Sequence, residues 1–580
     1  MVPTRLLRQM TGTVPAWVTA LAIASTASAG AATLLPFAVG RSIDITLSAV
    51  AGRATTAHMW TWVAYCAALT VIDACGDAFV QLGTGTTTGY CTGWLRRGLL
   101  RHILACGPKV TTRFAAGDAV SRLIGGTVDA GGAPSGAVLA LTAAIPTFGS
   151  VIALGLIDPW LVVAFLAGMP IVLLVLRSFL RDTSDVVRRY QEAQGTITAR
   201  LVETLSGART IAAAGTGERE IARVLRPLSQ LRDEGFRMWR VQGRVAGQSG
   251  LLVPALQVLV VAVAGFELTR HHISPGDLLA AGQYAALGAG IGATTGQLNR
   301  LARGRSGAAR VAEMLEVPPP EQGTARLPEG RGRVEFRGVT VRTGDTTVID
   351  DLNLVIPAGA NVAVVGASGA GKSTIAALAG RLADPSDGVV FLDGVPLRWL
   401  DRRELRTAVS YAFDRPALLG RTVGDMIGFG VRKSAGERVV TAARAARADQ
   451  FIRRLPRRYH TLLSRAPLSG GEVQRLGLAR ALAHAADARV LVLDDATSSL
   501  DTVTEMQVSR ALTELHGAHT MIVVTHRAAT AASADMVAWM EAGRLRACAP
   551  HAELWRDPDY RAVFGIRAPE RPPERAEARQ

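Results

Sequence analysis

The sequence predicts an α-helical membrane domain with six transmembrane helices, followed by a cytoplasmic α/β domain. Three observations lead to this prediction. Long uncharged stretches fill roughly the first 300 residues, whereas the rest of the chain is an ordinary charged mixture. Positive charge gathers in the loops on one side of those stretches. Short apolar runs in the second part stop at a polar or acidic residue, which is typical of buried strands in an α/β sheet.

The membrane domain is predicted over residues 1–316. Each uncharged stretch in it is about 18 residues or longer, which is enough to cross a hydrocarbon core about 30 Å thick. Soluble cores rarely need six such stretches, which argues against buried helices of a large soluble protein. The predicted spans cover residues 14–40, 56–78, 132–157, 159–180, 245–267 and 276–299.

The loops between the spans predict the orientation of the chain. Segments 73–129 and 177–244 are long, and the second alone carries thirteen arginines. The connectors 41–57, 158 and 267–277 are short and nearly free of positive charge. By the positive-inside rule the long segments are cytoplasmic. Because six spans return the chain to its starting side, the carboxyl-terminal part is cytoplasmic too. We expect a multi-pass protein of the inner or plasma membrane.

Composition excludes several other classes of protein. The first uncharged stretch is too long for the core of a signal peptide and lacks a convincing cleavage site, so it is expected to stay in the membrane. The five cysteines show no paired spacing such as CxxC, so neither a disulfide framework nor a zinc site is indicated. The net charge of +16 concentrates beside membrane spans without interleaved aromatic residues. We therefore expect contact with membrane lipid and no nucleic-acid partner.

Two pairs of polar residues in the membrane domain leave their role open. Asp73 and Asp77 lie at helical spacing near the second span. An ionisable residue at membrane depth is a functional-site hypothesis, but a stalk or interface position explains the pair equally well. His271 and His272 fall in the last outer loop, where solvated side chains are favoured over a metal site.

Residues 317–332, VPPPEQGTARLPEGRG, are rich in proline and glycine and are predicted to be a linker. The soluble domain is expected over residues 333–565. The charged, proline-rich segment 566–580 is predicted to be a disordered tail.

A phosphate-binding loop (P-loop) is predicted where GASGAGKST, residues 366–374, fits G-x-x-x-x-G-K-[ST] in full. The glycines let backbone N–H groups and the following helix dipole face phosphate oxygens, Lys372 supplies a cation and Ser373 a magnesium ligand. The strand-like NVAVV before the loop and the helical IAALAGRLA after it are the context that this mechanism requires. The nucleotide-binding residues predicted here are Gly366, Ser368, Gly369, Gly371, Lys372, Ser373 and Thr374.

Three further motifs complete a nucleotide site. LVLDD ends in Asp494, which is expected to hold magnesium next to Ser373. LSGGE, residues 468–472, precedes a helical pattern, and a glycine pair ahead of a helix is again an anion site. Because the chain already has its own phosphate loop, this second anion site points to a second chain. His526 follows the strand-like IVVT and is placed to reach a γ-phosphate.

These motifs, in this order and spacing, resemble the nucleotide-binding domain of the ATP-binding cassette (ABC) transporters. The six spans with two long cytoplasmic excursions resemble the exporter-type membrane domain of the same superfamily. The resemblance covers nearly the whole chain and identifies residues 333–565 as an α/β P-loop nucleotide-binding domain.

The resemblance implies a half-transporter that exports an unidentified small molecule, lipid or peptide, with ATP and Mg²⁺ as cofactors. Each ATP would lie between the phosphate loop of one chain and the signature motif of a second chain. The residues implied for this second contact are Ser469, Gly470 and Gly471, and Asp501 is also expected to bind nucleotide. Asp495, His526 and Asp414 would be the catalytic residues, and Ser373, Asp494 and Asp414 the metal ligands.

The chain departs from the family pattern at three positions. Asp495 stands where the family usually has a glutamate, so its carboxylate sits roughly 1.5 Å further back, and a misplacement of about 1 Å can cost a hundredfold in rate. Asp414 replaces a glutamine expected to contact magnesium and water. Thr343 replaces the aromatic residue expected to stack on adenine.

These departures leave more than one interpretation open. We favour a heterodimer in which this chain binds ATP but hydrolyses it slowly, and completes a competent site on an unlike partner. A homodimer in which Asp495 is a working base is the alternative. A weakly hydrolysing structural or regulatory subunit, or an importer with an exporter-like fold, also fits one chain. The sequence does not identify the cargo.

Overall fold

The computed structural model divides the chain into two compact units, of which the first comprises Met1–Leu104 with Phe114–Pro318 and the second Ala105–Arg113 with Pro319–Gln580. Residues 105–113, which the sequence analysis assigned to the membrane domain, therefore belong to the second unit. The structure describes residues 2–50, 55–289, 291–431, 435–514 and 517–565. The predicted disordered tail, 566–580, lies outside these ranges.

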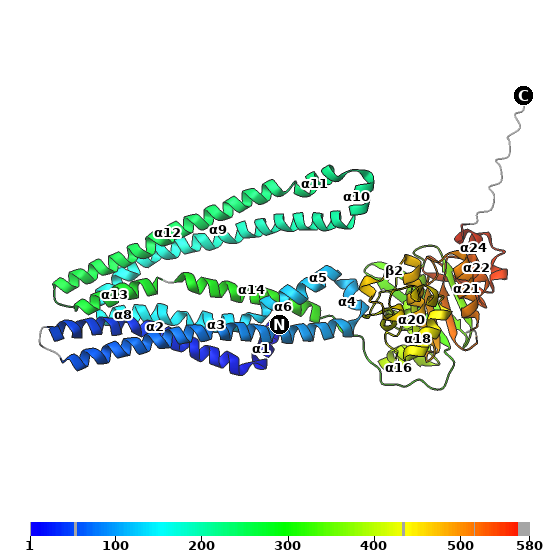
Figure 1. The fold of residues 1–580 in the computed structure, drawn as a ribbon, viewed down its shortest axis with the longest axis horizontal. Helices are drawn as coiled ribbons and strands as arrows, with labels where there is room; N and C mark the ends of the chain where they lie inside the picture. The colour runs from blue at the N-terminus through cyan, green and yellow to red at the C-terminus, as the bar shows by residue number, and fades with distance from the viewer. Residues whose placement is uncertain (1, 51–54, 290, 432–434, 515–516, 566–580) are drawn as a thin grey trace, which may run out of the picture. The chain divides into compact units, whose positions relative to one another are not determined.

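The first unit is built of helices, several of them very long (Figure 1). Its elements are α1 (Val2–Thr13), α2 (Pro15–Val50), α3 (Thr56–Cys106), α5 (Ala116–Ser121), the π-helix η1 (Arg122–Gly126), α6 (Thr127–Gly131), α7 (Ala133–Thr142), α8 (Ala144–Ile157), α9 (Pro159–Ser206), α10 (Ala208–Ala214), α11 (Gly217–Leu225), α12 (Leu228–Thr269), α13 (Pro275–Gly288) and α14 (Ile291–Leu315).

The described residues contain four helical stretches that are long and apolar enough to cross a membrane. They are Pro15–Val50, Ala57–Cys106, Ala116–Ile157 and Gly250–Thr269. The predicted fourth and sixth spans are helical, in α9 and in α13 with α14, but part of their side chains lies outside the described residues. The predicted number of six spans is therefore not confirmed. Helix α3 continues without a break past residue 78, where the second predicted span, 56–78, ends.

Asp73 and Asp77 both face Ser28 on α2. The Ser28 hydroxyl lies 2.8 Å from Asp73 Oδ1 and 3.1 Å from Asp77 Oδ1. Gly76 brings the two helices close together, since a Cβ added there would lie 2.7 Å from Ser28 Cβ. A hydroxyl shared by two carboxylates at a close helix crossing is a packing contact of the kind that small and polar residues make in membranes. The interface interpretation of this pair is therefore favoured.

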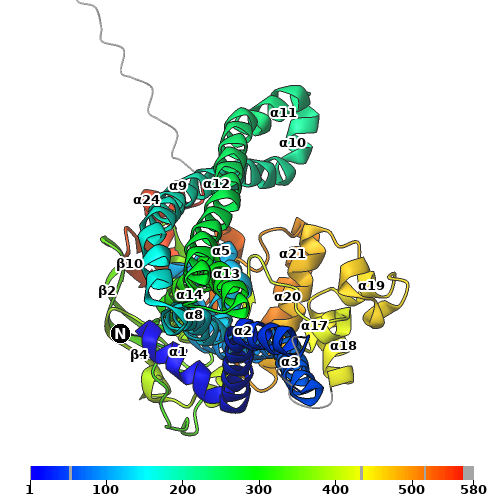
Figure 2. The ribbon, with the colours of Figure 1, turned by 90° about the vertical axis from the view of Figure 1, so that its left-hand side faces the viewer.

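Helices α9 and α12 form the longest hairpin of the first unit. They run side by side in both views, and α10 and α11 join them at their far end (Figures 1 and 2). Near the other end, Leu161 and Phe165 of α9 pack with Leu256 and Val260 of α12 in one buried cluster. The pairing of these apolar faces holds the hairpin together.

The second unit contains two sheets. A six-stranded sheet has the order β10-β9-β3-β8-β7-β6 and is parallel except for β10, and a four-stranded antiparallel sheet has the order β2-β1-β4-β5. The strands are β1 (Val334–Thr343), β2 (Thr346–Ile356), β3 (Asn361–Gly366), β4 (Asp387–Leu392), β5 (Val395–Pro396), β6 (Val409–Phe413), β7 (Val490–Asp494), β8 (Thr520–Val524), β9 (Met536–Glu541) and β10 (Arg544–Ala549).

Helices cover the six-stranded sheet and bury β7 on both faces. Val490 and Val492 belong to one buried cluster, whereas Leu491 and Leu493 belong to another. A strand buried on both faces reads as an unbroken apolar run, which explains VLVL ahead of Asp494.

Helices α17 to α20 lie together in Figure 2. The helices are α4 (Pro108–Arg113), α15 (Lys372–Ala379), α16 (Arg402–Ala408), α17 (Val423–Ile427), α18 (Ala435–Ala445), α19 (Asp449–Ile452), α20 (Gly470–Ala485), α21 (Thr502–Thr513), α22 (Ala528–Ala532), α23 (His551–Leu554) and α24 (Pro558–Val563), with short 3₁₀ turns at Leu397–Trp399, Arg458–His460 and Leu463–Arg465.

Segment 105–113 is held in the second unit by an ion pair. Lys109 Nζ lies 2.8 Å from Asp384 Oδ2, and Arg381 Nε lies 2.7 Å from the other oxygen of the same carboxylate. Arg402 donates to the carbonyl oxygen of Ala105 at 3.2 Å. Burial alone would raise the pKa of Asp384, but the hydrogen bonds from Arg381 and Lys109 outweigh it and hold the pKa below its ordinary value.

Candidate active site

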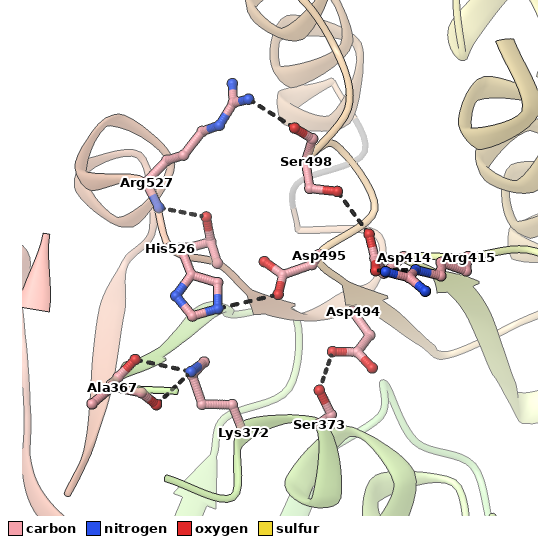
Figure 3. A network of polar contacts seen from close by, with 12 residues as sticks. Ala367, Lys372, Ser373, Asp414, Arg415, Asp494, Asp495, Ser498, His526 and Arg527 are labelled. Atoms are coloured by element: carbon pink, nitrogen blue, oxygen red, sulfur yellow. Dashed lines mark hydrogen bonds and ion pairs between the residues drawn. The ribbon is translucent and has the colours of Figure 1, made fainter. Parts of the chain in front are cut away.

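Four neighbouring strands end together at the candidate site. Pairing across the sheet sets Val364, Val524, Asp494 and Phe413 in one row. The residues that follow this row on β6, β7, β8 and β3 therefore emerge at the same carboxyl edge, where open α/β sheets bind their ligands. Asp414, Asp495 and His526, together with the predicted phosphate loop, are the residues brought there (Figure 3).

The phosphate loop between β3 and α15 needs its glycines for different reasons. Gly371 has a φ of +90°, and a Cβ added to it would lie 3.1 Å from the carbonyl oxygen of Val348. A side chain does not fit at Gly366 either, because a Cβ there would lie 2.3 Å from the carbonyl oxygen of Met540. Residues 367–369, which include Ser368, are exposed. The first turn of α15, with Lys372, Ser373 and Thr374, directly follows this exposed backbone.

Lys372 lies inside the loop with its ammonium group enclosed. Its Nζ donates to the carbonyl oxygens of Gly366 and Ala367, both at 2.9 Å (Figure 3). Burial lowers the pKa of Lys372, and the charges of Asp495 and Asp494 act in the opposite direction. The cation is thus positioned between the loop and the two carboxylates.

Ser373 and Asp494 meet as the sequence predicts. The Ser373 hydroxyl donates to Asp494 Oδ1 at 2.9 Å. Burial raises the pKa of Asp494, and the nearby charge of Asp414 adds to this, while the Ser373 hydrogen bond and Lys372 oppose it. A hydroxyl oxygen beside several carboxylates is the donor set that a hard divalent cation such as Mg²⁺ prefers. The residues therefore fit the predicted metal.

Asp495 adopts an unusual backbone conformation and faces His526. Its φ is +48°, in the left-handed region that residues other than glycine adopt rarely, although aspartate is among those that do so more often. Its Oδ2 lies 3.4 Å from His526 Nε2 (Figure 3). Burial raises the pKa of Asp495, the neighbouring Asp494 adds to this, and His526 and Lys372 oppose it.

Gln474 of α20 links the loop after β7 to Asp414. Its side chain amide nitrogen lies 3.1 Å from the Asp495 carbonyl oxygen and 2.8 Å from Ser498 Oγ. The same nitrogen lies 3.2 Å from the Asp414 carbonyl oxygen, and the amide oxygen accepts from the Ser499 N–H at 2.8 Å. Gln474 is only 2% exposed, and these hydrogen bonds satisfy the polar atoms of its buried side chain.

Asp414 is itself engaged in this network. Its Oδ1 accepts a hydrogen bond from the Ser498 hydroxyl at 2.7 Å (Figure 3). Arg527 holds the other side of the same loop through the carbonyl oxygens of Ser498 and Leu500, at 3.1 and 3.3 Å, and forms an ion pair with Glu505. The loop that carries Asp495 is therefore fixed from two directions.

Sequence reasoning missed Gln474 and Arg527. Gln474 is a polar residue among the buried apolar residues of α20, and Arg527 directly follows His526. Each signal is visible in the sequence, but neither indicates which distant backbone atoms these side chains contact. Only the fold brings the partners within reach.

The remaining predicted residues lie apart from the phosphate loop. Ser469 and Gly470 are exposed, and Ser469 caps α20 in a capping box with Glu472. Asp501 caps α21 through the Thr504 N–H at 3.0 Å. In the described part of the chain, no hydrogen bond or ion pair joins Ser469, Gly470, Gly471 or Asp501 to the phosphate loop. Thr343 ends β1 and pairs with Thr346 across the hairpin.

Comparison with known proteins gives matches over both units. Residues 18–288 match the model of the ABC transporter transmembrane region, and residues 349–498 match the model described as ABC transporter. The ABC transporter ATP-binding protein RamA of Streptomyces coelicolor is 46% identical over 545 residues, which are 94% of this chain and 84% of that protein. The chain belongs to the ABC transporter family.

This ABC transporter chain is also similar to two other proteins. The ATP-dependent lipid A-core flippase of Chromobacterium violaceum is 32% identical over 398 residues, 67% of each chain. The solved structure of a bacterial Atm1-family ABC exporter with ATP bound has the same fold, with a TM-score of 0.79 over 96% of this chain and 98% of that one, at 23% identity.

The membrane region and the nucleotide-binding domain are fused in one chain, as in a half-transporter of the exporter type. This ABC transporter chain is therefore a membrane protein whose nucleotide-binding domain is cytoplasmic. It binds ATP and couples ATP hydrolysis to transport, and ABC exporters of this kind work as dimers of half-transporters.

Proposed function

We propose that this chain exports a small molecule, lipid or peptide as one half of a heterodimer, and that its own hydrolysis site is slow. The relative named as a lipid A-core flippase supports export and a lipid-like cargo, whereas no relative reported above supports the importer alternative. The observation that carries the slow site is the position of Asp495, one methylene shorter than glutamate and turned toward His526 at 3.4 Å.

The residues at the sheet edge suit ATP with Mg²⁺. Exposed N–H groups of residues 367–369 and the Lys372 ammonium would bind phosphate oxygens. Ser373 and Asp494, already 2.9 Å apart, would hold the metal. The bound metal would neutralise charge on the phosphates. Gly470 and Gly471, on the same chain, have no hydrogen bond to this loop among the described residues, which supports their use on a partner.

Hydrolysis requires a base that takes a proton from the attacking water. Asp495 is the carboxylate placed for this role, and burial raises its pKa, which makes it a stronger base. The short side chain of Asp495 limits this role, because a base displaced by about 1 Å lowers the rate of hydrolysis on the order of a hundredfold. Asp414 does not replace it in this arrangement, since Ser498 and Gln474 both bind its Oδ1, at 2.7 and 3.4 Å, and hold the carboxylate within the network.

An unlike partner would restore turnover. We infer that this partner carries glutamate after its metal-binding aspartate and uses Ser469, Gly470 and Gly471 of this chain to complete its own site. The same features fit a mainly structural or regulatory ATP-binding subunit. The two proposals differ only in the rate of ATP hydrolysis at this chain's own site, which would be lower still in such a subunit. A homodimer, in contrast, would place Asp495 in both sites.

The test is steady-state ATPase of the purified chain in lipid nanodiscs, compared with the Asp495→Glu variant. The proposal expects a nearly inert native chain and a variant that turns over ATP about ten- to a hundredfold faster. If the native chain already hydrolyses ATP at the rate of the variant, and Asp495→Asn abolishes this activity, then Asp495 is the working base. The heterodimer proposal would then fail, and a self-sufficient homodimer would be favoured.

A further inference from the structure

We propose that Asp158, Glu267 and His272 form a binding site for a divalent transition-metal cation of the zinc type at one end of the first unit. One ligand atom of each side chain, a carboxylate oxygen or a ring nitrogen, lies within 4.8 Å of the other two. The three residues come from the α8–α9 turn and from the end of α12 with its following turn. None of the three residues belongs to the nucleotide site.

Glu267 is the core of the site. Its side chain is only 5% exposed, although a carboxylate is rarely buried unless it is paired or coordinates a metal. One oxygen lies 2.7 Å from His272 Nδ1. The other oxygen accepts no hydrogen bond from any residue that the structure describes. A buried carboxylate that lies beside a ring nitrogen and a second carboxylate, with one of its own oxygens not used by a hydrogen bond in the described residues, suits a bound cation.

The charges of the cluster are not balanced by lysine or arginine. Asp158 uses Oδ1 to cap α9 through the Trp160 N–H at 2.8 Å. Within the described residues, neither Asp158 nor Glu267 forms an ion pair with a lysine or arginine. Arg270, the nearest basic residue in sequence, lies over the ring of Phe266 at 4.2 Å instead. Two adjacent carboxylates repel each other, and a bound cation removes that repulsion.

The turn after α12 is shaped so that His272 faces Glu267. The His271 N–H donates to the Leu268 carbonyl oxygen and the His272 N–H to the Glu267 carbonyl oxygen, both at 3.0 Å. This is the hydrogen-bond pattern of a Schellman motif, which usually has glycine at the left-handed position. Here that position is His271, with a φ of +62°, a conformation that costs a residue other than glycine about 1 kcal/mol.

The ligand set selects the class of cation. Imidazole nitrogen favours zinc and related transition metals, and carboxylate oxygens are also accepted by zinc, whereas calcium prefers an all-oxygen shell. Three protein ligands leave a fourth position for water in a tetrahedral site. The His272 side chain is 59% exposed, so an ion can enter from solvent and the ring can adjust by the small shift that zinc distances of about 2.0–2.2 Å require.

The experiment uses the untagged full-length chain in lipid nanodiscs, treated with a chelator and kept free of nucleotide. Bound zinc is measured by mass spectrometry after ZnCl₂ is added and excess is removed, and the thermal unfolding midpoint is measured with and without ZnCl₂. We expect one zinc per chain and a higher unfolding midpoint. His272→Asn should weaken zinc binding at least about tenfold, and Glu267→Gln should do the same.

His271→Asn is the matched control, because it removes the adjacent imidazole with a residue that tolerates a positive φ. It should bind zinc as the native chain does. His272→Asn changes an exposed side chain, so its result stands even if Glu267→Gln does not fold. The proposal is overturned if the native chain binds no more zinc than His272→Asn. It is also overturned if His271→Asn loses as much zinc as His272→Asn, or if CaCl₂ raises the midpoint as much as ZnCl₂ does.

Discussion

His526 Nε2 and Asp495 Oδ2 lie 3.4 Å apart at the carboxyl edge of the six-stranded sheet. Asp495 directly follows Asp494 on β7, and His526 follows β8, so two adjacent strands present the contact. The contact with His526 orients the carboxylate of Asp495. The Asp495 side chain is one methylene shorter than glutamate, so this carboxylate does not reach the position that a glutamate carboxylate would occupy. Three of the four predictions below concern this site and the network that supports it.

Asp495→Glu is expected to raise the ATPase rate of the chain about ten- to a hundredfold, because the added methylene moves the carboxylate toward the attacking water. Asp495→Asn should leave only background activity, since an amide cannot accept the proton. The pH profile supplies a second readout. Burial raises the pKa of Asp495, so activity that depends on its ionised form should fall as the pH is lowered through that raised pKa. Steady-state phosphate release over a pH series measures both effects.

Gln474→Ala is expected to lower the turnover number about ten- to a hundredfold while the affinity for ATP stays unchanged. The side chain binds the Asp495 carbonyl oxygen and the Ser499 N–H, and within the described residues it forms no hydrogen bond with the phosphate loop. The Asp495→Glu background gives a rate high enough for this comparison, and nucleotide affinity is measured with a fluorescent ATP analogue. Gln507→Ala, an exposed glutamine on α21, is the control and should change neither quantity. Equal losses in rate and affinity would indicate general unfolding instead of positioning.

Asp384→Asn is expected to loosen segment 105–113, because the amide cannot form ion pairs with both Lys109 and Arg381. The free energy that stabilises this segment is expected to fall by about 1 kcal/mol, the size of the contribution from partly exposed ion pairs. The pKa of Asp384 is lowered in the folded chain, so this stabilisation is complete above the ordinary value of 3.8 and disappears only as the pH falls below it. Hydrogen exchange of residues 105–113 at neutral pH measures the effect. Asp387→Asn, which breaks an exposed pair with Arg342, should leave that exchange unchanged.

Use of the signature motif by a second chain can be tested by complementation. Chains with Lys372→Ala and chains with Ser469→Arg should each be inactive in the Asp495→Glu background. If Ser469 acts on the opposite chain, mixed dimers contain one intact site, and mixing before reconstitution should recover about a quarter of the activity of two intact sites. Chemical crosslinking verifies that mixed dimers form. Crosslinked mixed dimers without recovered activity would show that Ser469 serves its own chain.

The sequence predicts where β3, β7 and β8 end, because each strand end depends on a local pattern. The apolar run before Asp494 predicts a buried strand, and the glycines around Lys372 predict a phosphate-binding loop. Gln474 could not be predicted in the same way, since its partners Asp495 and Ser499 lie in another segment of the chain. The sheet order, which hydrophobic pattern does not determine, brings them together.

The membrane part was harder to predict in its boundaries and its polar contacts. Charge marked the end of the second predicted span, yet α3 continues as one helix through those charges, because a helix can leave the membrane without a break. His272 was expected to be a solvated side chain, and its distance of 2.7 Å to the buried Glu267 depends on the turn at the end of α12. A local sequence pattern contains no information on such a turn when its left-handed residue is histidine.

The length of the α9–α12 hairpin determines how far its end moves when the hairpin tilts. Helix α9 has 48 residues, which at 1.5 Å per residue makes a rod about 72 Å long. A rigid rod of that length that tilts by about one degree displaces its far end by about 1.3 Å. Such a lever converts a change in side-chain packing at one end into a shift of atomic size at the other. Pro170 and Pro254, inside α9 and α12, are the points where such a rod would bend instead of transmitting the shift.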